Sequence, residues 1–220
     1  MSRSAADAFV HEYLPPPQGG DAVTLLLLHG PAGEAHDLLR VGPLLDEGAG
    51  LLAPRGRVLE DGEPRFFRRS PDGPLDDRRA RTAELAAWLR AAAKHHGFDL
   101  RRIVAVGHGN GADMATSLLL LEPELLEAAV LFRPRGLPAP EHVPPLRGRA
   151  VFIAAGRADT SIPPAEPERL AVLLRSAGAD VVLHWDNAGS APDRREVAAA
   201  RAWLARRRLA HGLRVHDPPL

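Results

Sequence analysis

A glycine-rich turn separates an apolar stretch from a helical stretch in the middle of the chain. The segment from Gly107 to Gly111 follows the apolar run Ile103–Val106 and opens an apolar helical pattern. The first backbone N–H groups of a helix have no partner inside the helix, and the positive end of the helix dipole lies there. A helix that begins near Asn110 is therefore a natural site for a carboxylate or a phosphate.

Side chains that could transfer protons or attack a substrate lie near the ends of other apolar runs. They are His29, His108, Asp159, Ser161 and Ser190. His108 adjoins Gly109 and could serve as a base, whereas His29 is expected to pack and hydrogen-bond within its own loop. Neither serine has a recognisable base partner, so both are expected to be loop or cap residues. A metal held by His29, His108 and Asp159 would be unusual, because no close ligand spacing such as H-x-x-x-H occurs, and we expect no metal.

Short apolar runs alternate with helical patterns along the chain. The expected strands are Phe9–Leu14, Val23–Leu28, Gly50–Ala53, Ile103–Val106, Ala128–Phe132, Ala150–Ala154 and Val181–Trp185. The expected helices are His36–Leu45, Arg79–His95, Gly111–Leu121, Glu166–Ser176 and Asp193–Leu209. Several strands are continuously apolar, as expected where helices cover both faces of a parallel sheet. The sequence predicts one α/β domain over residues 1–220, with a mostly parallel, doubly wound sheet.

The composition is that of an ordinary globular protein. The chain has 220 residues, is 45% hydrophobic, and balances 28 basic against 28 acidic side chains, so no charge excess suggests nucleic acid or an anionic membrane. It has no cysteine, which excludes disulfides and thiolate ligands. No apolar run approaches the roughly 20 residues of a membrane-spanning helix, and the N-terminus does not resemble a secretory signal. We expect a cytoplasmic protein with no cofactor and no membrane or nucleic-acid partner.

The glycine-rich turn resembles the nucleophile elbow of the α/β-hydrolase fold, G-x-S-x-G. Further segments, in the same order, resemble the phospholipase/carboxylesterase family, and within it the small bacterial carboxylesterases that are similar to dienelactone hydrolase. These segments are Leu25–Glu34, Leu52–Gly56, Arg65–Arg69, Ala154–Pro163 and Gly178–Val181. The resemblance covers roughly residues 8–206 and implies a single-domain α/β-hydrolase fold.

The resemblance implies a Ser-His-Asp triad, of which this sequence keeps one member. Asp159 stands at the position of the acid, Gly109 at that of the nucleophile and Ser190 at that of the histidine. A hydroxyl cannot act as a general base near neutral pH. Of the two N–H groups of the oxyanion hole, that of Asn110 is kept, but the other position holds Pro31, which has no N–H. Serine-hydrolase activity is therefore expected to be lost.

A pocket without this chemistry is expected to bind a small ester-like or aromatic ligand. The candidate ligand-binding residues are Pro31, His29, His108, Asn110 and Phe66. Four arginines could add positive charge: Arg55, Arg65, Arg68 and Arg69. Asp159 would oppose an anionic ligand unless it is paired, for example with Arg157.

Three other functions stay open at this point. The first is an active hydrolase or lyase in which water attacks the substrate directly, with the help of Asp159 and an unassigned base. The second is dinucleotide binding, because Gly107, Gly109 and Ala112 also fit G-x-G-x-x-[GA], with Arg133 and Arg135 available for a 2′-phosphate. That fingerprint normally opens the first β-α-β unit, whereas at least one expected strand precedes it here. The third is a purely structural role, for example as the dimer partner of an active paralogue. A homodimer is a separate expectation about partners.

Overall fold

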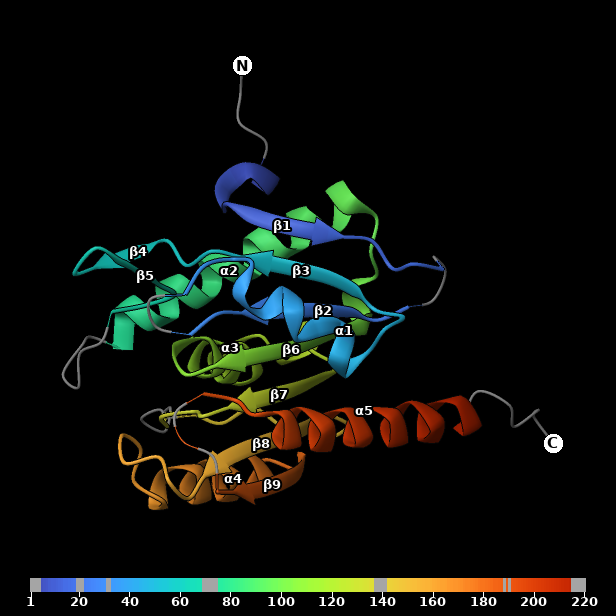
Figure 1. The fold of residues 1–220 in the computed structure, drawn as a ribbon. Coiled ribbons are helices and arrows are strands. Elements are labelled where there is room, and N and C mark those ends of the chain that lie inside the picture. The colour runs from blue at the N-terminus through green and yellow to red at the C-terminus, as the bar shows by residue number, and fades with distance from the viewer. Residues whose placement is uncertain are drawn as a thin grey trace.

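A seven-stranded sheet runs through the centre of the molecule (Figure 1). The structure is a computed structural model and describes residues 5–18, 22–30, 33–68, 75–136, 142–187, 189 and 191–214. In spatial order the strands are β1 (His11–Leu14), β3 (Gly50–Pro54), β2 (Thr24–Leu28), β6 (Ile103–His108), β7 (Ala128–Phe132), β8 (Ala150–Gly156) and β9 (Asp180–Asp186). Every neighbouring pair is parallel except β1 with β3.

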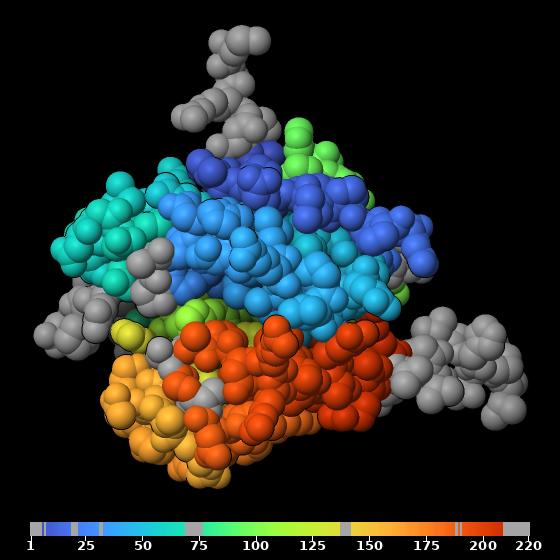
Figure 2. All heavy atoms as spheres, viewed as in Figure 1, coloured from blue at the N-terminus to red at the C-terminus, as the bar shows by residue number. Residues whose placement is uncertain are grey.

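Helices cover both faces of this sheet. On one face lie α1 (Gly42–Leu45) and α5 (Arg194–Arg214), and on the other α2 (Leu75–His96), α3 (Asn110–Leu121) and α4 (Ala165–Ser176) (Figure 1). Alternate residues of each strand therefore belong to two separate apolar clusters, with Leu26 and Leu28 in one and Leu25 and Leu27 in the other. In the space-filling view, the surface over α1 meets the surface over α5 (Figure 2).

The expected fold class is confirmed, since the sheet is mostly parallel and is covered by helices on both faces. The N-terminal strand begins at His11 rather than at Phe9, because the Phe9 ring packs into the core with its centroid 5.0 Å from that of Trp88. The helix expected over His36–Leu45 was wrong as one element. It is a 3-10 turn η2 (Asp37–Arg40) followed by the single-turn helix α1.

Three further 3-10 turns connect the main elements. They are η1 (Ala5–Ala8), η3 (Leu100–Arg102) and η4 (Pro123–Leu125). A small hairpin of β4 (Val58–Glu60) and β5 (Glu63–Arg65) was not predicted. Its turn has positive φ at Asp61 (55°) and Gly62 (82°), which is the conformation that an Asp-Gly pair favours in a two-residue hairpin.

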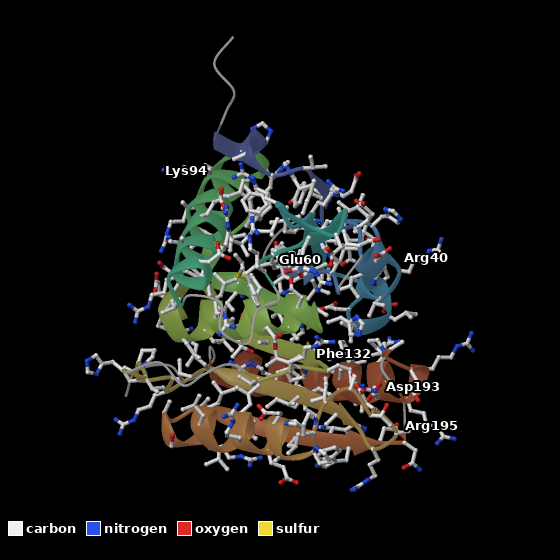
Figure 3. All side chains as sticks on the ribbon, turned by 90° about the vertical axis from the view of Figure 1, so that its left-hand side faces the viewer. Arg40, Glu60, Lys94, Phe132, Asp193 and Arg195 are labelled. Atoms are coloured by element: carbon white, nitrogen blue, oxygen red, sulfur yellow. The ribbon has the colours of Figure 1, made fainter. Side chains whose placement is uncertain are left out.

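Within the described part of the chain, no helix is both long and apolar enough to cross a membrane. The side-chain view shows Phe132 in the interior, whereas Arg40, Lys94 and Arg195 project from the surface (Figure 3).

Candidate functional site

The turn between β6 and α3 has the backbone geometry of a nucleophile elbow. Gly109 has φ 52° and ψ −114°, a conformation that residues with a Cβ rarely adopt. Its N–H donates to the Phe132 carbonyl at 2.9 Å, and its carbonyl accepts from the N–H of Asp113 at 2.9 Å. The turn is thus bonded to the end of β7 on one side and to the first turn of α3 on the other.

The two flanking glycines are required because backbone atoms approach them closely. A Cβ on Gly107 would lie 2.4 Å from the Gly111 carbonyl oxygen, and a Cβ on Gly111 would lie 2.0 Å from the Leu28 carbonyl oxygen. Helix α3 therefore lies directly against the ends of β6 and β2. The outer glycines of the motif are explained by this packing.

The β2 and β6 strands are neighbours, although their following chain segments run to opposite sides of the sheet. Ligands of open α/β sheets bind at such a position, beyond the carboxyl ends of the strands. The His108 ring lies over the loop that follows β2, since a Cβ on Gly30 would lie 2.5 Å from His108 Nδ1. His108 is half-buried at this place, beside Gly109.

His29, at the end of β2, has a structural role. It is 1% exposed; its Nδ1–H donates to the Gly30 carbonyl at 2.8 Å, and its Nε2 accepts from the Gly56 N–H at 2.8 Å. Burial lowers the pKa of this imidazole and so keeps it neutral, as these two bonds require. Both ring nitrogens are thus bonded to backbone groups, in agreement with the expectation that His29 packs and hydrogen-bonds; ligand binding by His29 stays a prediction.

Asn110 and Phe66 lie together beside the elbow. The Asn110 Oδ1 accepts from the Phe66 N–H at 2.7 Å, and its Nδ2 donates to the Phe67 carbonyl at 3.3 Å. The Phe66 ring lies 4.7 Å from the His29 ring, measured between centroids, and is 3% exposed. The Asn110 side chain thus holds the segment after β5 against the start of α3.

Asp159 follows β8 and lies in the loop that leads to α4. Its Oδ1 accepts from the N–H of Ser161 at 2.8 Å and from the Ser161 hydroxyl at 2.6 Å. Its Oδ2 accepts no hydrogen bond and lies 3.8 Å from the Nε of Arg133, both side chains being 3% exposed. Asp159 is thus paired with Arg133 and not with Arg157, whose guanidinium lies over the Trp185 ring, 5.3 Å from its centroid.

Arg133 connects the ends of three strands with the start of α5. Its guanidinium binds both carboxylate oxygens of Glu196, at 2.6 and 2.8 Å, and donates to the carbonyls of Ala154 at 3.1 Å and Gly189 at 2.7 Å. Its φ is 55°, which is unusual for a residue with a Cβ. A side chain that is buried and paired in this way is not available to a 2′-phosphate, so this part of the dinucleotide interpretation was wrong.

Sequence reasoning did not assign this structural role to Arg133. The sequence shows only the Asp-x-x-Glu spacing that ends at its partner Glu196, which indicates a helix cap but not a bond to Arg133. Asp193 and Glu196 form a reciprocal cap at the start of α5, in which each side chain accepts from the other residue's N–H at 2.9 and 3.0 Å. An acid in such a cap, buried with 0% exposure, requires a cation near it.

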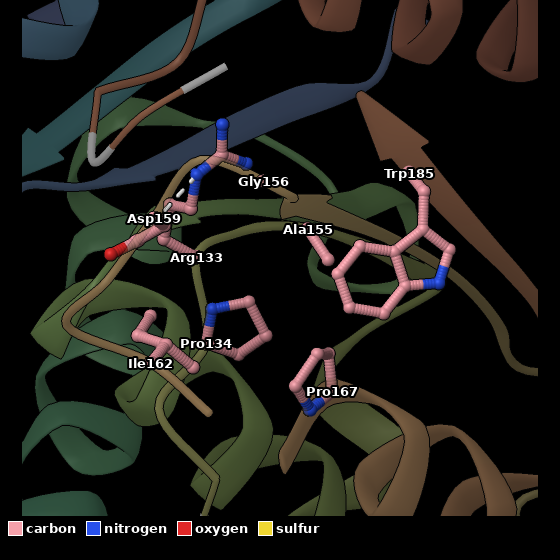
Figure 4. Close-up of a pocket in the computed structure, with 8 residues that line it drawn as sticks. All are labelled: Arg133, Pro134, Ala155, Gly156, Asp159, Ile162, Pro167 and Trp185. Atoms are coloured by element: carbon pink, nitrogen blue, oxygen red, sulfur yellow. Dashed lines mark ion pairs between the residues drawn. The ribbon is translucent and has the colours of Figure 1, made fainter. Parts of the chain in front are cut away.

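A shallow hollow lies beside Arg133 and Asp159, at the carboxyl ends of β7, β8 and β9 (Figure 4). Pro134 and Ile162 lie near the ion pair, and Trp185 stands on the opposite side (Figure 4). The lining is completed by Ala155, Gly156 and Pro167.

Asp113 is a second residue that sequence reasoning missed. It lies in the first turn of α3, is 5% exposed, and accepts at Oδ1 from the Arg135 N–H at 2.9 Å. Burial raises the pKa of this carboxyl to about 7, although the Arg135 N–H and the charges of Arg78 and Arg135 act in the opposite direction. A buried acid beside the elbow has no signal in sequence, because α3 is apolar around it.

The structure describes only some of the remaining predicted residues. Pro31, Arg69 and Ser190 lie outside the described residues. Arg55 pairs with Glu34 at 2.7 Å and Arg65 with Glu60 at 2.8 Å, so these two arginines do not add free positive charge. In the described ranges, no three metal-ligating side chains gather as a metal site.

A mostly parallel sheet, an elbow between β6 and α3 and a buried acid after β8 together define a protein of the α/β-hydrolase fold. Residues 73–208 match the Dienelactone hydrolase family. The chain belongs to this family.

Three proteins that are similar to this chain are described as a hydrolase or a carboxylesterase. The chain is 40% identical over 185 residues to the putative hydrolase MhqD of Bacillus subtilis (strain 168), with 81% of this chain and 90% of that protein covered. It is 40% identical to the Bacillus cereus carboxylesterase, with a TM-score of 0.87 over 90% of this chain and 94% of that one. The carboxylesterase from Mesorhizobium loti is 33% identical, with a TM-score of 0.81 over 90% and 95% of the two chains.

Proposed function

We propose that this member of the family has lost serine-hydrolase catalysis and binds a small ester-like or aromatic ligand at the elbow. The observation that carries the proposal is Gly109. It occupies the central position of an elbow that has the required backbone geometry, and it has no side chain that could attack a substrate. The frame of a hydrolase site is present without its nucleophile.

Two further positions support the loss. Ser190 stands where the resemblance places the general base, and Pro31 stands where it places an oxyanion N–H. Loss of a nucleophile or base costs about 10⁶-fold in rate, and loss of one oxyanion donor about 10²–10³-fold. These losses are not additive, but they affect attack, proton transfer and charge stabilisation separately.

The surroundings of Asp159 also support the proposal. Ser161 bonds to Oδ1 of this carboxylate, and Oδ2 lies 3.8 Å from the Nε of Arg133. A permanent cation thus stands where the triad of the family would place an imidazole. The same Arg133 binds the carbonyl of Gly189, which directly precedes Ser190. The acid therefore has a structural partner other than a histidine.

The direct test is hydrolysis of short p-nitrophenyl esters by three forms of the chain. The parent is expected to remain at the buffer background. A Gly109→Ser, Ser190→His variant is expected to turn over, whereas a Gly109→Ala, Ser190→His variant has the same added histidine and backbone strain but no hydroxyl and should stay inactive. Turnover by the parent would contradict the proposal and would favour direct water attack with Asp159 and a different base.

Ligand binding is tested separately from catalysis. Short aromatic esters should raise the melting temperature of the parent saturably, without release of alcohol. Absence of any saturable shift across such a series would leave the loss of catalysis intact but would contradict the binding role. Whether the chain forms a homodimer stays a prediction, which sedimentation velocity would check.

A further inference from the structure

Two histidines meet far from the elbow, between the edge strand β1 and the end of α2. His11 Nε2 lies 2.9 Å from His96 Nε2, and the ring centroids are 5.2 Å apart. The two imidazoles therefore meet end to end through their Nε2 atoms. They attach the N-terminal strand to a helix that begins more than sixty residues later in the chain.

The hydrogen bonds fix how many protons this contact can hold. His11 Nδ1 lies 2.9 Å from the Phe9 carbonyl, which can only accept, so the proton of neutral His11 is on Nδ1. Its Nε2 must then accept from His96 Nε2–H. One additional proton can be placed on either ring without breaking the contact. A second additional proton gives two N–H groups that face each other, and the contact is lost.

Basic and aromatic residues adjoin the histidine pair. His95 and Lys94 precede His96 on α2, and the Tyr13 ring stacks on His96 with centroids 4.3 Å apart. Among the described residues, no carboxylate forms an ion pair with either His11 or His96. Burial, His11 and His95 all lower the pKa of His96, and burial raises that of Tyr13 and keeps the phenol neutral.

Arg57 and Trp88 also lie near the N-terminal segment. Arg57, from the segment after β3, lies over the Phe9 ring at 5.4 Å and is paired with Glu84. Trp88 is uncharged; its ring centroid lies 5.2 Å from that of His11, and its Nε1 donates to the Ala6 carbonyl at 2.8 Å, which is a second hydrogen bond between the N-terminal segment and α2. Of these two hydrogen bonds, the histidine pair is the titratable one.

We propose that the His11–His96 pair is a pH-sensitive device that holds β1 on the sheet near neutral pH and releases it on acidification. The attached state binds one additional proton at most, whereas the released state binds two. Protonation therefore favours release, and once the first proton is bound, each pH unit below the ordinary histidine value shifts the balance by up to about tenfold. Release uncovers the edge of β3, because β1 is the strand that pairs with it there.

The test is amide hydrogen exchange of the full chain at pH 7.5 and 5.5, corrected for the intrinsic effect of pH. Exchange in peptides covering β1 should be about tenfold faster at pH 5.5, while peptides covering β7 should be unchanged. His96→Gln supplies an amide donor that does not titrate, so this variant should protect β1 equally at both pH values. His36→Gln removes an exposed imidazole that lies beside Asp37, outside the pair, and should behave like the parent.

Three results would overturn the proposal. One is equal protection of β1 in the parent at both pH values. Another is an acid-dependent loss of protection that persists in His96→Gln. The third is parallel loss in β1 and β7, which indicates global unfolding.

Discussion

At the scale of single residues, the glycines of the elbow are present for different physical reasons. Gly111 is fixed by space, because a Cβ would lie 2.0 Å from the Leu28 carbonyl oxygen, whereas Gly109 is fixed by its backbone conformation. We expect Gly111→Ala to lower the free energy of unfolding by more than about 3 kcal/mol, and Gly109→Ala by about 1–3 kcal/mol. Urea denaturation of both variants checks this order.

Gly48→Ala is the matched control for these two substitutions. Gly48 does not have positive φ, and a Cβ there would meet only the Asp46 carboxylate at 3.7 Å. Its unfolding free energy should stay within about 0.5 kcal/mol of the parent. A Gly109→Ala variant as stable as this control would show that the elbow is not strained.

The buried carboxyl of Asp113 predicts an unusual pH dependence of stability. Its pKa is about 7 in the folded chain, above the ordinary value of 3.8. Between these values the unfolded chain has released the proton and the folded chain has kept it, so stability falls as pH rises through this window and is level above it. Asp113→Asn keeps an acceptor for the Arg135 N–H and removes the charge. We expect it to be more stable at pH 8, by at most about 4 kcal/mol, and less dependent on pH.

Denaturation curves of the parent and Asp113→Asn at pH 5 and pH 8 check this expectation. Asp99→Asn serves as the comparison, because the pKa of Asp99 is lowered by its bonds to Arg101. This control should not gain stability at pH 8. If both variants respond alike to pH, burial of Asp113 is not the cause.

The predictability of individual residues depended on where their partners lie in the chain. Ser161 was expected to be a loop or cap residue because it has no recognisable base partner, and the partner it has in the structure, Asp159, is two residues away. Arg133 and Glu196 are 63 residues apart, and neither shows in sequence that the other is its partner. The role of the elbow came from resemblance, while its flanking glycines are explained only by the close approach of α3 to β2.

At the scale of elements, the Arg133–Glu196 pair attaches α5 to the sheet. Breaking a buried ion pair by removing one partner leaves the other charge uncompensated. Glu196→Gln should therefore lower the free energy of unfolding by about 3–5 kcal/mol. Guanidinium denaturation measures this loss, and hydrogen exchange should locate it at the start of α5.

An exposed pair provides the contrast. Arg101 pairs with Asp99 at 3.0 Å, and its side chain is 89% exposed. Arg101→Ala should cost at most about 1 kcal/mol. A cost for Glu196→Gln as small as this would mean that Asp159 and the nearby carbonyls compensate Arg133 without Glu196.

Helices and strands with a clear pattern of apolar residues were predicted well. Short elements whose structure depends on turns were predicted poorly. The continuously apolar strands β7 and β8 were placed almost to the residue, because a strand buried on both faces has a distinct pattern. The β4–β5 hairpin was missed, although Asp61 and Gly62 are its sequence signal, because its strands have only three residues each. The segment around η2 and α1 was predicted as one helix, since periodicity alone does not distinguish consecutive short turns.

At the scale of the whole molecule, charge balance predicts behaviour in solution. The chain has equal numbers of acidic and basic side chains and a sequence pI of about 7.2. Proteins without net charge associate more readily. We expect light scattering at low salt to show most self-association near pH 7 and less at pH 9. A homodimer held by a specific interface would instead keep its size at both pH values.

The bonds of Arg133 have a consequence for synthesis on the ribosome. Its side-chain partners, Ala154, Asp159, Gly189 and Glu196, all come later in the chain, the last of them 63 residues later. Strand β7 therefore leaves the ribosome long before the carboxylate that balances its arginine has been translated. The carboxyl half of the sheet can reach its final arrangement only after the first turn of α5 has emerged. A nascent chain stalled before residue 196 should remain sensitive to protease in β7 to β9.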